Sequence, residues 1–149
     1  ALLAVGVLPG LALPWVGFDP GVASGWRTVA CAAAVVIGHV YPVWYEFRGG
    51  KGAATLIGAV AVLAPAALLP VAVVWLACVV LTGYVGLGTV LGTATLPVFF
   101  WLAEPRSVPL VSFGAVMAAF IAYTHRANIA RMRAGEENRA RRLWLLRPR

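Results

Sequence analysis

A lysine surrounded by glycines is the feature of this sequence best suited to chemistry. Lys51 follows Gly49 and Gly50 and precedes Gly52, and an apolar segment begins at Ala53. If a helix starts there, the glycines leave backbone N–H groups free to converge on an anion, with the positive end of the helix dipole behind them. We expect this loop to bind a phosphate group.

The glycines alone leave a second interpretation open. A tight turn at the cytoplasmic face would also favour a lysine, because cytoplasmic loops are enriched in basic residues. The loop is not a nucleotide-binding P-loop, which needs Ser or Thr after the lysine and an earlier glycine at a fixed spacing. The sequence has Gly52 and Tyr45 at those positions.

Polar side chains also stand at the ends of two other apolar segments. His39 lies near the end of one, where an ionisable group is costly and indicates function; a neutral histidine bonded to a carbonyl is the alternative. His125, Arg126 and Asn128 follow the last apolar segment. Because His125 and Asn128 are three positions apart, they share a helix face, and we expect that face to meet the Lys51 loop.

The sequence offers little for covalent or metal catalysis. A histidine without a nearby acid or cysteine partner is a weak metal site, so we predict no metal. The serines, Ser24, Ser107 and Ser112, lack the Gly-x-Ser-x-Gly elbow of serine hydrolases, and Cys31 and Cys78 lie in apolar runs. Any acyl transfer is therefore expected to run directly between bound substrates.

The composition indicates a membrane protein. Apolar residues make up 62% of the 149 positions and charged residues 11%, whereas soluble domains have about 45–50% and about 25%. An ordinary water-soluble fold is thereby excluded. The formal net charge of +7 comes mostly from residues 126–149. A basic stretch that follows an apolar span indicates contact with anionic lipid headgroups, not with nucleic acid.

The apolar segments predict an all-α polytopic membrane protein with six helices that cross the bilayer fully or in part. A full crossing needs about 20 apolar residues, and the longest uncharged run, residues 53–103, is divided by prolines and by the glycines of Gly83–Gly88. The shortest helix is either a tilted crossing or a half-helix covered by other helices. The expected helices are Ala1–Phe18, Thr28–Tyr45, Ala53–Ala64, Ala66–Thr82, Thr89–Ala103 and Val108–Tyr123.

The basic residues predict the orientation. Their concentration in residues 126–149 places the C-terminus in the cytoplasm. Counting back through six crossings puts Ala1 there too, together with three polar clusters, Gly38–Thr55, Thr82–Thr89 and His125–Glu137. We expect residues 1–125 to form the helix bundle and residues 126–149 a basic tail, whose interfacial helix ends in Leu143–Leu146.

Two motifs resemble those of the bacterial membrane acyl-phosphate:glycerol-3-phosphate acyltransferases, the PlsY family. The stretch Gly38-His39-x-Tyr41-Pro42, continued by Phe47-x-Gly49-Gly50-Lys51-Gly52-x-Ala54-Thr55, is similar to the central motif of that family. The stretch His125-Arg126-x-Asn128-Ile129-x-Arg131, followed by Gly135-Glu136, is similar to its C-terminal motif.

The resemblance implies a fold and a reaction. The fold has seven membrane helices and a cytoplasmic active site, so one N-terminal helix would be missing here. The reaction transfers a fatty acyl group from acyl phosphate to the 1-hydroxyl of glycerol 3-phosphate and gives lysophosphatidic acid, with no metal or organic cofactor. Because acyl phosphate carries a good leaving group, positioning and charge neutralisation can supply much of the rate.

The resemblance also implies partners and site residues. The partners are the two substrates and membrane lipids, without nucleic acid, and we expect a monomer in the bacterial inner membrane. The catalytic residues, which position the two substrates, would be His39, His125 and Asn128. Those that bind substrate or phosphate would be Arg48, Gly49, Gly50, Lys51, Gly52, Thr55 and Arg126.

Departures from the family pattern leave a second function open. Gly6 and Pro9 stand where the family has Asp and Lys, and Gly83–Thr89 lacks its usual Arg and serines. The N-terminal Gly-Ser-Gly-Asn loop of the family is missing, and no basic residue precedes Ala1–Phe18 as in a secretory signal, so we expect the chain to begin partway through a larger protein. The alternative is a diverged membrane protein that binds anionic lipid or a phosphorylated metabolite without catalysis.

Overall fold

The described part of the chain consists of six α-helices and two 3-10 turns. The computed structural model describes residues 24–103, 106–140 and 143–144, so the expected helix Ala1–Phe18 lies outside the described residues. The 3-10 turns are η1 (Val43–Tyr45) and η2 (Pro65–Ala67). The helices are α2 (Ser24–Val40), α3 (Ala53–Leu63), α4 (Leu68–Thr82), α5 (Val85–Leu102), α6 (Val108–Thr124) and α7 (Arg126–Arg133). These ranges contain no strand, and the expected all-α class is confirmed.

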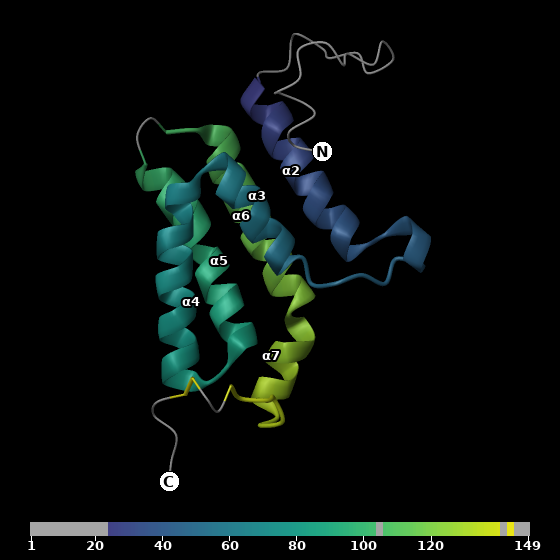
Figure 1. The fold of residues 1–149 in the computed structure, drawn as a ribbon, viewed down its shortest axis with the longest axis vertical. Helices are drawn as coiled ribbons and strands as arrows, with labels where there is room; N and C mark the ends of the chain where they lie inside the picture. Colours follow the sequence, from purple (N-terminus) through teal and green to yellow (C-terminus); the bar gives the residue numbers. More distant parts are fainter. Residues whose placement is uncertain (1–23, 104–105, 141–142, 145–149) are drawn as a thin grey trace.

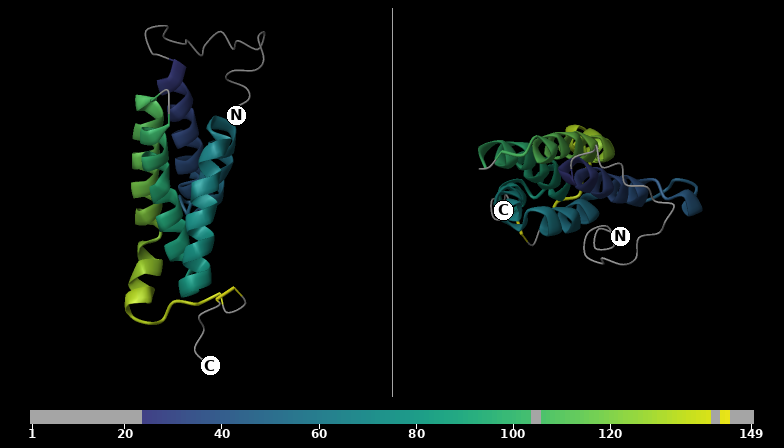
Figure 2. Two further views of the ribbon diagram at one scale, coloured as in Figure 1. Left: turned by 90° about the vertical axis from the view of Figure 1, so that its left-hand side faces the viewer. Right: turned by 90° about the horizontal axis from the view of Figure 1, so that it is seen from above.

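The helices form a bundle with α5 at its centre. Helix α5 packs against α4 on one side and against α6 on the other, and α2 contacts both α3 and α6. Figure 1 shows each of the α2–α3, α4–α5 and α6–α7 connections at the lower end of the helices that it joins, with the α2–α3 connection projecting from the side of the bundle at about mid-height. The turned view in Figure 2 shows the C-terminal segment passing from α7 beneath the end of α4. The three expected polar clusters therefore lie at helix ends that face the same way.

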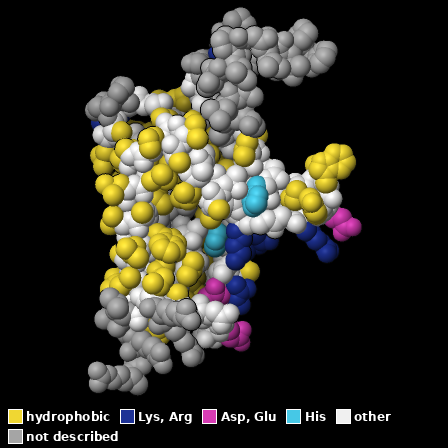
Figure 3. Space-filling model, viewed as in Figure 1, with side chains coloured by type: hydrophobic (Ala, Val, Ile, Leu, Met, Phe, Trp, Pro, Cys, Tyr) yellow, Lys and Arg dark blue, Asp and Glu magenta, His cyan; other side chains and the backbone are white. Residues whose placement is uncertain are grey.

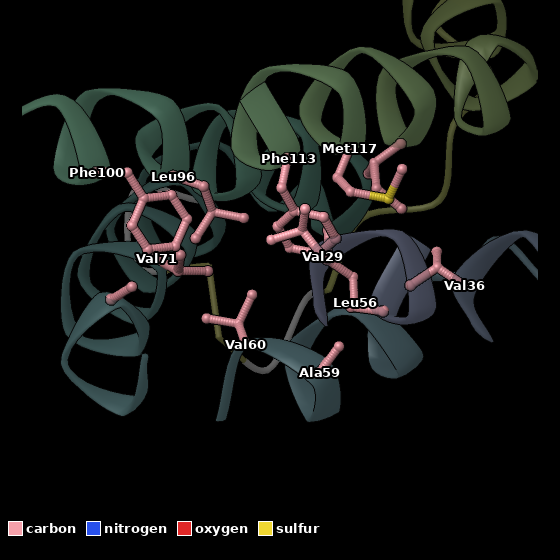
Figure 4. Packing of buried hydrophobic residues seen from close by; sticks show 13 residues of the cluster. Val29, Val36, Leu56, Ala59, Val60, Val71, Leu96, Phe100, Phe113 and Met117 are labelled. Carbon is pink, nitrogen blue, oxygen red and sulfur yellow. The ribbon is translucent and has the colours of Figure 1, made fainter. Parts of the chain in front are cut away.

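Aliphatic and aromatic side chains from α2, α3, α4, α5 and α6 form the core. Leu56 and Val60 are fully buried on one face of α3. Figure 4 shows Leu56 in one buried cluster with Val29 of α2 and Met117 of α6. This packing fixes the short helix α3, and with it the Lys51 loop that precedes it, against the longer helices.

Three helical stretches of the described residues are long and apolar enough to cross a membrane: Gly25–Tyr45, Pro65–Thr82 and Val85–Leu102. The pair α6 and α7, bent by 53°, adds a fourth if it is counted as one span. Helix α3 has 11 residues, which corresponds to about 16 Å and roughly half of the hydrocarbon layer. Its length fits the expected half-helix.

Large apolar side chains cover the outer faces of the long helices. Leu69, Val73 and Leu76 of α4 and Val98 of α5 are all more than half exposed. Soluble proteins rarely expose apolar surface on this scale, whereas such side chains suit lipid hydrocarbon. The chain is a multi-pass membrane protein.

Two helix boundaries at the polar end differ from the expected ones. Helix α2 stops at Val40 and not at Tyr45, because Pro42 has no N–H to continue it. Helix α5 begins at Val85 and not at Thr89, and therefore contains two of the glycines that were expected in a loop. A Cβ on Gly88 would lie 3.1 Å from a backbone oxygen of α4, so glycine here lets the two helices approach closely.

The tail also differs from expectation, because α7 ends at Arg133 and the described residues 134–140 and 143–144 are not helical; the end of the expected helix, residues 145–146, lies outside the described residues. The N–H of Gly135 donates to the carbonyl of Met132 at 3.1 Å, and the N–H of Glu136 donates to that of Arg131 at 2.8 Å. With Gly135 at φ +75°, these two bonds form the Schellman motif that ends many helices. The described residues after Gly135 are not helical and turn back toward the α4–α5 connection.

Candidate active site

The Lys51 loop folds back tightly on the end of α2. The N–H of Gly49 donates to the carbonyl of Val40 at 3.0 Å, and a Cβ on Gly50 would lie 2.7 Å from Nε2 of His39. Gly52 has φ +80° and directly precedes α3, a backbone conformation that glycine adopts without strain. The loop thus presents Lys51 at the start of a helix, as the sequence predicted, with His39 packed beside it.

Lys51 meets Asn128 from the far end of the chain. Its Nζ atom donates to Oδ1 of Asn128 at 2.6 Å. The Nδ2 atom of Asn128 donates to Oε1 of Glu137 at 2.6 Å, and Nε of Arg131 donates to Oε2 of the same carboxylate at 2.7 Å. Four side chains therefore form one continuous polar network, and the expected meeting of the tail with the Lys51 loop is confirmed.

The network fixes the orientation of the Asn128 amide. A lysine ammonium only donates hydrogen bonds, and a carboxylate only accepts them. The amide oxygen must therefore face Lys51 and the amide nitrogen must face Glu137. Asn128 is 7% exposed, so an amide left without these partners would be costly.

Glu137 is held in its charged form. The amide hydrogen bond from Asn128 lowers the pKa of Glu137, and the hydrogen bond and charge of Arg131 lower it further, against the opposing effect of burial. The carboxylate is thus ionised at neutral pH and accepts from both neighbours.

His125 lies next to this network, immediately after α6. It is 5% exposed, and its Nδ1 atom lies 2.8 Å from the carbonyl oxygen of Ile121. Because a carbonyl only accepts, Nδ1 carries the proton and Nε2 keeps its lone pair in the neutral ring. In that state Nε2 is free to accept a proton.

Thr124 ties the two motifs together through the backbone. Its hydroxyl lies 2.9 Å from the carbonyl oxygen of Lys51 and 3.0 Å from that of Ile121. The hydroxyl oxygen is also 3.3 Å from Nδ1 of His125. The end of α6 is thus hydrogen-bonded to the backbone of Lys51, just before the start of α3.

The other predicted site residues lie around this network without taking part in its hydrogen bonds. His39 and Arg48 are exposed, and Thr55 is half-buried on α3. The exposed Arg126 donates to the carbonyl of Tyr123 at 3.0 Å and lies 4.1 Å over its ring. Figure 3 shows charged and histidine side chains gathered beside and below the α2–α3 loop, while the rest of this face is mainly hydrophobic or uncharged.

An apolar cleft of about 400 Å³ opens beside the polar network. It lies between α3, α4 and α5, and its wall begins at Ala53, immediately after the Lys51 loop. The lining residues include Ala53, Ala54, Ile57, Val71, Trp75 and Thr93. A volume of this size and a mainly apolar lining are typical of sites that bind small molecules.

Arg131 and Glu137 of the network, and Thr124 beside it, were not assigned a role from the sequence. Arg131 was read only as part of the C-terminal motif. Two adjacent acids, Glu136 and Glu137, stand in an otherwise basic tail, and this pattern could have indicated that one of them forms an ion pair with a nearby arginine. Among the described residues, no three His, Cys, Asp or Glu side chains gather as metal ligands would; the expected lack of a metal stays a prediction.

Comparison with known proteins connects this geometry to a family. The sequence model of the glycerol-3-phosphate acyltransferase family matches residues 3–135. The chain is 40% identical to the glycerol-3-phosphate acyltransferase of Syntrophomonas wolfei over 131 residues, which is 88% of this chain and 66% of the relative. It is 39% identical to that of Rhizobium meliloti over 123 residues, which is 83% of this chain and 56% of the relative.

The fold is also similar to solved structures. The crystal structure of PlsY (YgiH), an integral membrane glycerol 3-phosphate acyltransferase, in its glycerol 3-phosphate form matches with a TM-score of 0.73 and 36% identity. This match covers 76% of the present chain and 56% of the other. The chain spans between half and two thirds of the length of these relatives. By sequence and by fold, the chain belongs to the glycerol-3-phosphate acyltransferase family.

Proposed function

We propose that the protein transfers a fatty acyl group from acyl phosphate to glycerol 3-phosphate and forms lysophosphatidic acid. The observation that carries this proposal is the 2.6 Å contact between Lys51 and Asn128, with Lys51 two positions before Ala53, the residue with which the lining of the apolar cleft begins. A charged group at the edge of an apolar space suits a substrate with a phosphate at one end and an acyl chain at the other. The family to which the chain belongs supports the same activity.

Lys51 is proposed to hold substrate phosphate. An ammonium group has three N–H donors, of which one is used by Asn128. The remaining donors are available for phosphate oxygens, with the positive end of the α3 dipole behind them. We assign supporting contacts to the amides of Gly49, Gly50 and Gly52 and to Arg48, Thr55 and Arg126.

The cleft is proposed to receive the acyl chain. Its walls are almost entirely apolar, and the hydroxyl of Thr93, which lines it, donates to a backbone carbonyl of its own helix. Little polar surface would therefore lose hydration when an alkyl chain enters. An acyl chain in this cleft would bring its carbonyl carbon to the level of Lys51.

The chemical step is direct transfer. The 1-hydroxyl oxygen of glycerol 3-phosphate attacks the carbonyl carbon of acyl phosphate and forms the new ester bond. The bond from that carbon to the phosphate oxygen breaks, and inorganic phosphate leaves with the electron pair. The hydroxyl proton passes to Nε2 of His125, whose neutral ring is suited to accept it, while Asn128 and His39 position the substrates.

Location and assembly belong to the same proposal. We place residues 1–125 in the bacterial inner membrane as a helix bundle and residues 126–149 as a basic tail at its cytoplasmic surface, because basic residues concentrate there. The active site then faces the cytoplasm, where soluble glycerol 3-phosphate can reach it. The protein is proposed to act as a monomer.

The test uses the purified full-length protein in lipid vesicles with acyl phosphate and radiolabelled glycerol 3-phosphate. We expect labelled lysophosphatidic acid and an equal amount of inorganic phosphate, with neither formed when one substrate is omitted. Binding of either substrate without product would support the alternative of a non-catalytic lipid- or metabolite-binding protein, and would overturn the proposed reaction.

A further inference from the structure

We propose that Arg139 and Trp144 are positioning residues for Lys51. They clamp the C-terminal segment to the α4–α5 turn, keep Glu137 on Asn128, and so hold Asn128 against the lysine ammonium. The inference rests on the proposed function, because it treats Lys51 as the group that binds phosphate. It adds a part of the chain that carries neither of the two motifs.

The clamp consists of stacked side chains and backbone hydrogen bonds. The guanidinium of Arg139 lies 4.6 Å from the ring centre of Tyr84 and 4.4 Å from that of Trp144, and so contacts both rings. The indole N–H of Trp144 donates to the carbonyl of Leu81 at 3.1 Å. Such cation–π contacts are favourable because the ring faces carry negative charge density.

The backbone of the same segment is pinned at Gly83. The N–H of Ala140 donates to the carbonyl of Gly83 at 2.7 Å. A Cβ on Gly83, which has φ +78°, would lie 3.1 Å from Cβ of Arg139 and 3.2 Å from Cγ of Trp144. The α4–α5 turn therefore offers a bare backbone surface on which the segment sits.

The clamp acts on the network because Glu137 stands only two positions before Arg139. The Schellman motif fixes the chain at Gly135 on one side of Glu137, and the clamp fixes it at Arg139 on the other. The carboxylate is thus held between two anchored points while it accepts from Asn128 at 2.6 Å.

The ion pair between Arg131 and Glu137 is too exposed to hold the Glu137 carboxylate on Asn128 by itself. The Arg131 side chain is 46% exposed, and ion pairs at such positions contribute little to stability. Without the clamp, the segment that carries Glu137 would be free to leave Asn128. The Asn128 amide could then rotate, and Lys51, which is itself exposed, would lose its fixed position.

The first test measures the position of Lys51 directly. Lys51 is the only lysine in the chain, so its reaction with acetic anhydride can be followed in the full-length protein by mass spectrometry of its peptide. We expect Arg139→Ala and Trp144→Ala to raise the rate of Lys51 acetylation about tenfold, and we expect Asn128→Ala to raise it to a similar extent. Arg133→Ala removes an exposed arginine of the same region and should leave the rate unchanged.

The second test measures binding of glycerol 3-phosphate and of inorganic phosphate by calorimetry. We expect both clamp variants to weaken binding by about tenfold, within the usual range of coupling between sites. Arg139→Lys keeps the charge but not the planar stacking group, and should be almost as weak as Arg139→Ala. Trp144→Phe keeps an aromatic ring and should restore much of the binding.

A double substitution tests whether the effect passes through Glu137. In a Glu137→Ala background, Arg139→Ala should cause little further loss of binding, because the Ala side chain cannot accept from Asn128 and the link is already removed. Losses that multiply would overturn the inference, as would unchanged Lys51 acetylation in both clamp variants. If Arg139→Ala does not fold in detergent, Arg139→Lys and Trp144→Phe decide the question by the same measurements.

The outcomes separate this inference from the proposed function. A wild-type protein that neither binds nor uses the substrates would contradict the function, while clamp-dependent acetylation of Lys51 would still support the clamp. If the wild-type protein forms product and the clamp variants bind and react like wild type, the proposed role of Arg139 and Trp144 would be contradicted, while the proposed function would stand.

Discussion

At the scale of single residues, Asn128 is the centre of the site because one side chain satisfies a cation and an anion at once. Its oxygen accepts from Lys51 and its nitrogen donates to Glu137, each at 2.6 Å. Sequence spacing placed Asn128 and His125 on the same helix face and facing Lys51. It could not show that Glu137 completes the network, because that contact depends on how the chain turns after Arg133.

We expect Asn128→Ala to destabilise the protein and to weaken phosphate binding. Removing the buried amide breaks its two hydrogen bonds to charged partners, and hydrogen bonds to charged groups contribute about 1.5–3 kcal/mol each to the free energy of unfolding. Thermal unfolding in detergent measures this loss. The matched control is Asn138→Ala, an exposed asparagine in the same tail, which should unfold like wild type. Equal stability of the two variants would argue against the network.

The pH dependence of stability should depend on Glu137. Its pKa is lower in the folded protein than the ordinary value of 4.5, so the ionised carboxylate stabilises the fold above that value. This stabilisation is lost as the pH falls through the lowered folded pKa. We therefore expect Glu137→Gln to be less stable than wild type at neutral pH, with the difference disappearing in acid below pH 4.5.

The neighbouring Glu136 supplies the control for this titration. It is exposed, so Glu136→Gln should unfold like wild type at neutral pH, where Glu137→Gln is expected to be less stable. A difference between Glu137→Gln and wild type that stays constant from pH 7 into the acid range would contradict the assignment of the network charge to Glu137.

At the scale of helices, close packing explains why α5 begins before the residue expected from the sequence. Gly83 to Gly88 read as a loop because glycine is a poor helix former in isolation. In the fold, Gly88 and Gly92 both lie against the backbone of α4. A Cβ on Gly88 would lie 3.1 Å from the carbonyl oxygen of Trp75, and a Cβ on Gly92 would lie 3.0 Å from that of Val71. Tertiary packing, which a single sequence does not display, overrides the local preference.

The Gly92→Ala variant tests this packing. The added methyl group would lie 3.0 Å from the Val71 oxygen, so we expect a loss of about 1–3 kcal/mol, as for other overpacked sites. Gly58→Ala is the matched control, since nothing lies within 4 Å of its built Cβ. That change should be neutral or stabilising by up to about 1 kcal/mol. Unfolding titrations in detergent compare the two, and equal effects would contradict the close approach of α4 and α5.

At the scale of the whole molecule, hydropathy and charge predicted most of the architecture. The positions of α3, α4 and α6 follow from uncharged runs interrupted by Pro65, Gly83 and the charged residues near 104–106. The tail was harder to predict, because its position depends on contacts with the α4–α5 turn. Arg139 stacks on the ring of Tyr84, and Arg139 and Trp144 pack against Gly83. Such contacts between distant segments have no periodic signature in the sequence.

The proposed orientation predicts which residues are reached from each side of the membrane. In a background in which Cys31 and Cys78 are replaced by serine, we expect Arg48→Cys to react with an impermeant maleimide only from the cytoplasmic side. Arg106→Cys, in the connection at the opposite end of the bundle, should react only from outside. Labelling of intact cells and of inverted vesicles measures both, and the reverse pattern would overturn the orientation.

The role of Lys51 as the phosphate-binding group is tested most directly by the affinity of the full-length protein for glycerol 3-phosphate. With Lys51→Ala we predict that binding and the formation of lysophosphatidic acid are both lost, while both activities persist in the Arg133→Ala control. Because the buried Asn128 oxygen loses its partner, we expect the unfolding temperature of Lys51→Ala to fall below that of the control, but by no more than in Asn128→Ala. A folded Lys51→Ala protein with wild-type affinity and turnover would contradict the central claim.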